Sequence, residues 1–209
     1  MKKAVILSLT FQLLLVPAMF LAARPDDELY WQKICIQTLG EEKGNDLFLQ
    51  IADAIRKDNV AVFLRIIDAQ STSTLLKMGN AIFNIHYKTG LGGEPELLAE
   101  TTILLSIVKR LDSDRTSEAC LDALKDSTLH PKWRALLAYN LLFDPYESVI
   151  NENGIRIKKY GINSLSLENK QKWLHVLQKL QEENTEDSQL LKSVTTSIEK
   201  LQESLRYSK

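Results

Sequence analysis

The sequence predicts an all-α fold in which antiparallel helix hairpins stack on one another, in the manner of an α-solenoid. Between Glu94 and Phe143, three amphipathic segments follow one another, and each begins with a helix start signal. Proline and glycine are few, with 5 and 8 residues, which suits long helices better than a turn-rich β protein. Helical pairs recur roughly every 35–45 residues, a period typical of stacked helix-pair repeats.

The composition is that of an ordinary globular chain. Hydrophobic residues make up 44% and charged residues 25% of the 209 residues, which indicates neither disorder nor a protein with many membrane spans. A chain of this length suffices for one domain with a continuous core. The formal net charge is −1, from 26 basic and 27 acidic residues. Because the charge is near neutral and the bases do not cluster, we expect no binding to nucleic acid.

Residues 1–23 have the pattern of a secretory signal peptide. Lys2 and Lys3 precede an apolar run, residues 4–23, which ends in small residues before the polar segment that begins at Arg24. We therefore expect cleavage after residue 23 and a periplasmic or secreted protein. The alternative is an uncleaved membrane anchor, since a helix rising 1.5 Å per residue over this run just crosses a hydrocarbon layer of ~30 Å. Contact with a membrane is expected only in that second case.

The remaining residues, 24–209, are expected to form a single all-helical domain. In its first half, helical periodicity predicts helices over residues 26–39, 45–57, 59–67 and 71–90. Gly40 is expected to end the first of them and Asn59 to cap the third. The segment 60–67 alone also suits a buried strand, but its position between helical segments favours a helix. Residues 90–93, with Leu91-Gly92-Gly93, are expected to be a flexible joint.

The central segment contains three helices with inner stripes at helical spacing. Glu94-Pro95 begins the first, Asp112-Ser113-Asp114 the second and His130-Pro131 the third. The expected inner positions are Leu97, Thr101, Leu104, Leu105, Val108 and Leu111, then Thr116, Cys120, Ala123 and Leu124, then Trp133, Leu136, Leu137, Asn140 and Leu141.

The pattern is ambiguous between residues 145 and 163. Asn153-Gly154 is a typical turn of a β-hairpin, yet Tyr146, Ile150, Ile157 and Tyr160 also fit one face of a helix, so both alternatives stay open. From Ser166 onward, a C-terminal helical hairpin is expected over residues 166–206. The expected inner seam of its last helix consists of Leu191, Val194, Ile198, Leu201 and Leu205.

The segment Asp112–Leu142 resembles a repeat of the HEAT type. The likeness lies in its polar start, in the small residues of its first helix, and in Pro131, Trp133 and Arg134, which begin its second helix. The resemblance implies an α-solenoid of the HEAT or TPR type, a class of protein that binds other macromolecules.

Two fragments match motifs of serine-acylating penicillin-binding proteins and β-lactamases. Ser106-Ile107-Val108-Lys109 matches S-x-x-K, and Lys88-Thr89-Gly90 matches K-T-G. Their order along the chain is the reverse of the order in that family, and Ser197–Lys200 matches S-x-x-K a second time. We interpret these matches as coincidence and expect no enzymatic activity.

No set of residues indicates a metal or a cofactor. His86, His130 and His175 are isolated, without a second histidine or cysteine at the spacing that seeds a zinc site. Residues 90–93 lack the Lys-Ser/Thr that follows the glycines of a phosphate-binding loop. Arg156, Lys158 and Lys159 form a small basic patch, which we interpret as a solvated face.

Cys35 and Cys120 are the two cysteines of the chain. In an oxidising compartment they are candidates for a disulfide, which would close a long loop and stabilise the fold by up to ~4–5 kcal/mol. The alternative is two buried thiols, since a free cysteine packs as a small apolar residue. We favour the thiols slightly, because helices so far apart in a helix stack need not touch.

Trp133 and Arg134 are the candidate residues for contact with a partner, because tryptophan and arginine are enriched at binding hot spots. Alternatively, Trp133 closes the seam between adjacent helix pairs, which we favour because it shares a stripe with Leu136 and Leu137.

Two classes of function follow from these features. The first is an exported, non-enzymatic helical-repeat protein that serves as a scaffold or adaptor for an unidentified protein partner. The second is a helical binder of an apolar or envelope-derived ligand. An exposed face with aromatic and charged residues favours the first class, and an enclosed apolar cavity favours the second.

Overall fold

The computed structural model describes residues 25–89, 94–141, 146–151, 154–159, 161–183 and 188–207. Contacts divide the chain into two compact units, of which the first ends at Ile103 and the second begins at Leu104. The division lies inside helix α6 (Glu94–Val108), whereas the expected joint, residues 90–93, is outside the described residues. The expected signal peptide is outside them as well. No helix in the described part of the chain combines the length and the apolar character needed to cross a membrane.

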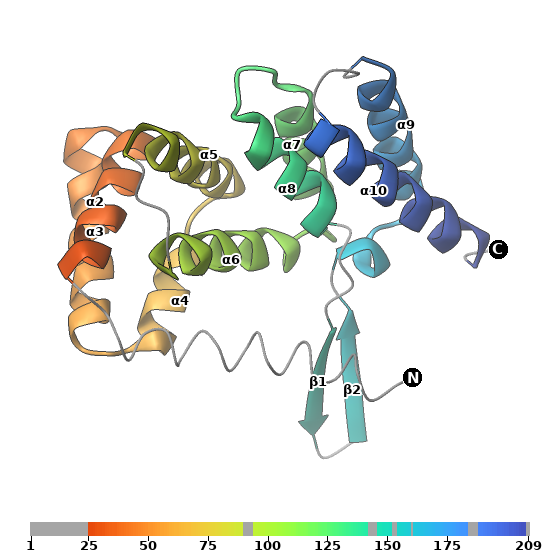
Figure 1. Ribbon diagram of the computed structural model, residues 1–209. Coiled ribbons are helices and arrows are strands. Elements are labelled where there is room, and N and C mark those ends of the chain that lie inside the picture. Colours follow the sequence, from red (N-terminus) through yellow and green to blue (C-terminus); the bar gives the residue numbers. More distant parts are fainter. Residues whose placement is uncertain are drawn as a thin grey trace. The chain divides into compact units, whose positions relative to one another are not determined.

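The first unit is built from consecutive helices. They are α2 (Pro25–Leu39), α3 (Glu41–Arg56), α4 (Val60–Asp68) and α5 (Thr72–Thr89), followed by the start of α6. Helix α2 packs against α3 and α5, and α3 also packs against α4 (Figure 1). The segment 60–67, which alone would also suit a strand, is helical as expected.

Helices α2 and α3 approach each other very closely at Gly44. A Cβ atom at this position would lie 2.6 Å from Cα of Ile36 and 2.7 Å from the carbonyl oxygen of Cys35. A residue without a side chain therefore allows the two backbones to come this near. On α2 and α4, the rings of Trp31 and Phe63 meet edge to face in the core, with centroids 5.3 Å apart and planes at 77°.

The ends of these helices follow local signals. Gly40 ends α2 with φ 81° and ψ 175°, a conformation suited to glycine. At the end of α3, the N–H of Asp58 donates to the carbonyl of Ile55 and the N–H of Asn59 donates to that of Ala54, both at 2.9 Å. This pair of bonds is a Schellman motif, and it places Asp58 at φ 48°. Asn59 then caps α4, because its Oδ1 accepts the N–H of Val62 at 3.1 Å.

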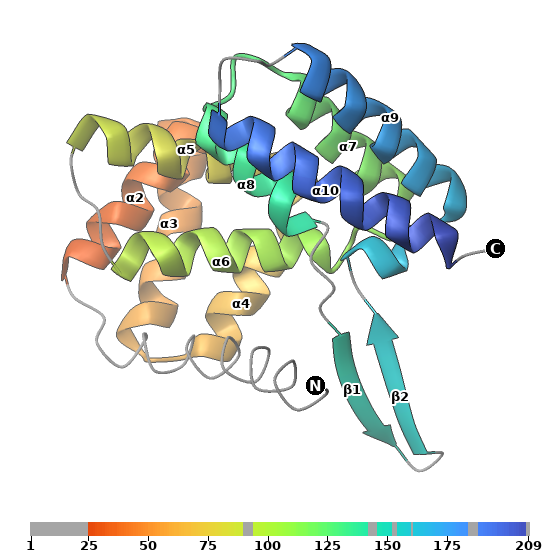
Figure 2. The ribbon, with the colours of Figure 1, turned by 45° about the vertical axis from the view of Figure 1, so that its right-hand side comes forward.

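The second unit consists of two helix hairpins and a β-hairpin between them. Its helices are α7 (Asp114–Lys125), α8 (Pro131–Leu141), α9 (Leu167–Glu183) and α10 (Ser188–Arg206), with a short 3-10 turn η1 (Gly161–Ser164) before α9. Helix α7 packs against α8 and α9, and α10 packs against α8 and α9 (Figure 2). The first helices of the two hairpins thus meet each other, and so do the second helices. In the first unit the order differs, since α3 meets α4 and α2 meets α5.

The inner stripe of α7 lies where the sequence predicts it, because Thr116, Cys120, Ala123 and Leu124 are all buried. The stripe predicted for α6 is confirmed only in part. Leu104, Val108 and Leu111 are buried as predicted, but Thr101 and Leu105 are half-buried, and Ala99, Ile103 and Ile107, outside the predicted stripe, are fully buried. Apolar residues occur around most of α6, so their spacing does not single out one face.

The expected seam of α10 is likewise confirmed in part. Val194, Ile198 and Leu201 are buried as predicted, while Leu191 and Leu205 are only half-buried, and Leu190 and Ser197 are buried in addition. Because α10 packs against both α8 and α9, its buried surface is wider than the narrow stripe of a helix that faces one neighbour.

The ambiguous segment between α8 and α9 forms a β-hairpin. Strands β1 (Tyr146–Asn151) and β2 (Gly154–Lys159) are antiparallel, and their register runs from Tyr146 opposite Lys159 to Asn151 opposite Gly154. In Figures 1 and 2 the hairpin extends away from helices α7 to α10. The expected helical fold class is confirmed, with this hairpin as the β structure of the described residues.

Candidate functional site

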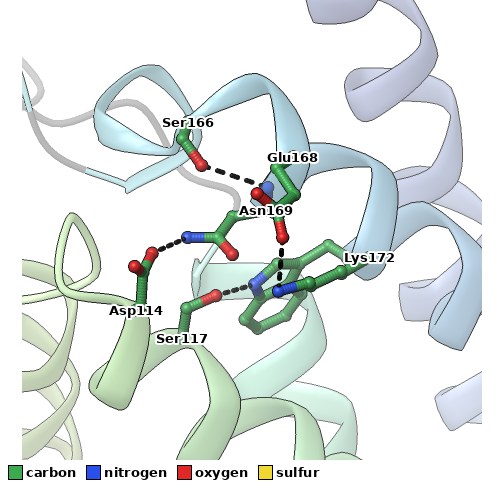
Figure 3. Close-up of polar contacts among 7 residues, drawn as sticks. Asp114, Ser117, Ser166, Glu168, Asn169 and Lys172 are labelled. Atoms are coloured by element: carbon green, nitrogen blue, oxygen red, sulfur yellow. Dashed lines mark hydrogen bonds and ion pairs between the residues drawn. The ribbon is translucent and has the colours of Figure 1, made fainter.

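A polar cluster joins the first halves of α7 and α9 (Figure 3). The indole Nε1–H of Trp173 donates to Oγ of Ser117 at 2.7 Å, and both residues are 0% exposed. At the rim of the cluster, Nδ2 of Asn169 donates to Oδ1 of Asp114, also at 2.7 Å. The backbone N–H of Asn169 donates in turn to Oγ of Ser166 at 3.1 Å, which caps the start of α9. These bonds fix the start of α9 against α7.

Charged residues border the cluster on its exposed side. Nζ of Lys172 and Oε1 of Glu168 form an ion pair at 2.8 Å. The hydrogen bond and the charge of Glu168 raise the pKa of Lys172, and the charges of Glu118 and Asp114 add to this effect. Lysines that act as general bases have a lowered pKa, so Lys172 is a permanent cation here.

The cluster stabilises the fold and does not activate a nucleophile. The hydroxyl of Ser117 accepts a hydrogen bond from an indole N–H, which is a donor only and cannot take the proton of the serine. A nucleophilic serine needs a neighbouring base in that place. We therefore interpret the cluster as the structural junction between two stacked helix hairpins.

Trp133 and Arg134, the candidate partner contacts, lie inside the second unit. Trp133 is 0% exposed and Arg134 is 6% exposed. Nε of Arg134 donates to the carbonyl oxygen of Leu124 at 2.9 Å, in the last turn of α7. A direct contact with a partner would need exposed side chains, so the burial contradicts that interpretation of the two residues. It agrees with the alternative, in which Trp133 packs between helices.

Cys35 and Cys120 are both free thiols, one in the core of each unit. Burial raises the pKa of each thiol to about 12. Such thiols are protonated at neutral pH and react slowly, because the thiolate is the nucleophile. The two cysteines are therefore described as buried thiols, the interpretation favoured above, and a thiol count tests the alternative of a disulfide between them.

The serines of the S-x-x-K matches are both buried and hydrogen-bonded. Oγ of Ser106 accepts a hydrogen bond from Nη2 of Arg110 at 3.2 Å. Oγ of Ser197 donates to the carbonyl oxygen of Ala138 at 2.8 Å and so links α10 to α8. The K-T-G match at residues 88–90 lies partly outside the described residues. These contacts give both serines a structural role.

The histidines also fit structural or surface roles. Nδ1 of His130 accepts the backbone N–H of Lys132 at 3.2 Å and caps the start of α8. His175 is exposed on α9, and the side chain of His86 is outside the described part. Within the described residues, no group of three or more histidine, cysteine, aspartate or glutamate side chains is placed to hold a metal ion.

The structure reveals an exposed face that the sequence analysis did not identify. Tyr139 on α8 is 40% exposed, and Nζ of Lys200 on α10 lies 5.3 Å from the centroid of its ring. Lys200, Glu203 and Tyr207 follow one another at helical spacing, and Tyr207 is 83% exposed. We call Tyr139, Lys200, Glu203 and Tyr207 the α8–α10 face. In the sequence, Tyr139 lies off the inner stripe predicted for its helix, and this position indicates a solvent-exposed side chain.

Comparison with known protein families, with curated proteins and with solved structures finds no match.

Proposed function

We propose that the protein is an exported, non-enzymatic helical scaffold or adaptor that binds another protein. One observation carries this proposal. The serine, cysteine and arginine side chains that were candidates for a reaction or for contact with a partner are buried in the core. Aromatic and charged side chains, in contrast, are accessible to solvent on the α8–α10 face. Aromatic residues are enriched at protein interfaces, and reactive groups are of no use where substrate cannot reach them.

The arrangement of the second unit supports the resemblance to HEAT-type repeats. The segment that carries the resemblance corresponds to the hairpin α7–α8, which stacks on the hairpin α9–α10 with like helices in contact. Such stacks bury one side of each helix and leave an extended surface for a partner. The buried bonds from Trp173 to Ser117 and from Ser197 to Ala138 make the stack rigid, which lowers the entropic cost of binding.

The α8–α10 face has the composition of a contact surface. Tyr139 and Tyr207 provide aromatic area, and Lys200 and Glu203 provide charges of both signs between them. The mixed charge favours specificity by pairing with a complementary partner surface and does not favour general attraction to a polyanion. We propose that a protein with an apolar anchor and neighbouring charges of both signs occupies this face.

The test is capture of a partner from the envelope fraction with the immobilised protein, followed by rebinding of the purified partner. We expect one protein to bind saturably. Lys200→Glu should weaken the rebinding, because it reverses a charge beside Tyr139. Lys179→Glu is the control, since Lys179 is a lysine of the neighbouring helix α9 that is more exposed than Lys200 and is not part of the α8–α10 face as defined above.

Two outcomes would overturn the proposal. If Lys179→Glu weakens rebinding as much as Lys200→Glu, the α8–α10 face is not the contact. If the purified protein instead carries a bound apolar molecule and captures no protein, the ligand-binding function is the correct one.

A further inference from the structure

We draw no further inference here: the strongest candidate, the side of the β1–β2 hairpin on which the register places Tyr146, Ile150, Ile155 and Ile157, carries no proposal, because nothing in the structure shows what covers it.

Discussion

Replacing Ser117 by alanine removes the acceptor of a hydrogen bond at the junction of α7 and α9. The indole N–H of Trp173 lies 2.7 Å from Oγ of Ser117, and neither residue is exposed. An N–H left without an acceptor in the interior costs ~1–3 kcal/mol. For a chain of this size each kcal/mol lowers Tm by ~2–4 °C, so we expect Ser117→Ala to lower Tm by roughly 2–12 °C.

A double-mutant cycle separates the bond from other effects. Trp173→Phe removes the donor and also leaves space in the core, so it should cost more than Ser117→Ala. The double variant should cost less than the sum of the two, with a coupling of ~1 kcal/mol or more, because each single change breaks the same bond. Urea unfolding followed by circular dichroism gives the free energies of unfolding of the four proteins.

The control for this cycle is Ser113→Ala. Ser113 precedes α7 but makes no side-chain hydrogen bond at the cap, so its replacement should change the free energy of unfolding by less than ~0.5 kcal/mol. If the changes at Ser117 and Trp173 are additive within ~0.5 kcal/mol, the bond does not stabilise the junction and this reasoning is refuted.

Three further predictions concern the glycine contact, a strained residue and the thiols. Gly44→Ala should destabilise the first unit, because a Cβ atom 2.6 Å from the backbone of α2 costs ~1–3 kcal/mol in overpacking and outweighs the helix propensity that alanine gains; a higher urea midpoint than the parent's would contradict this. Asp58→Gly should raise the free energy of unfolding by up to ~1 kcal/mol, since it relieves φ 48°; a lower value would show that the aspartate is not strained. Cys35 and Cys120 should not react with a thiol reagent in the native protein at neutral pH, and both should react after unfolding without reductant; no reaction in the unfolded protein would demonstrate a disulfide instead.

The features that the sequence predicts correctly are those that depend on neighbouring residues. Gly40 ends α2, Asn59 caps α4 and His130 caps α8, each through a bond that reaches at most four residues along the chain. Helical periodicity likewise places α7 and its buried stripe. Such local signals need no knowledge of what packs against the helix.

The features that the sequence misses depend on distant partners. Helix α6 is apolar on most sides, so its buried face is set by packing and not by its own spacing. Ser117 and Trp173 are 56 positions apart, and no local pattern joins them. The same holds for the candidate contact residues. Arginine is a residue type common at binding hot spots, yet the side chain of Arg134 is buried and donates a hydrogen bond to the carbonyl oxygen of Leu124 at the end of α7. Tyr139, on the same helix, is exposed instead.

The central claim is that the α8–α10 face binds a protein, and one titration tests it most directly. The dissociation constant of the purified partner is measured by calorimetry for the parent, for Tyr139→Ala and for Leu167→Ala. Both replaced side chains are exposed apolar groups of the second unit, but Leu167 is on α9. An aromatic anchor contributes ~2 kcal/mol or more, so we predict that Tyr139→Ala weakens binding roughly 30-fold and that Leu167→Ala leaves it unchanged. Equal affinities of the parent and Tyr139→Ala would contradict the claim.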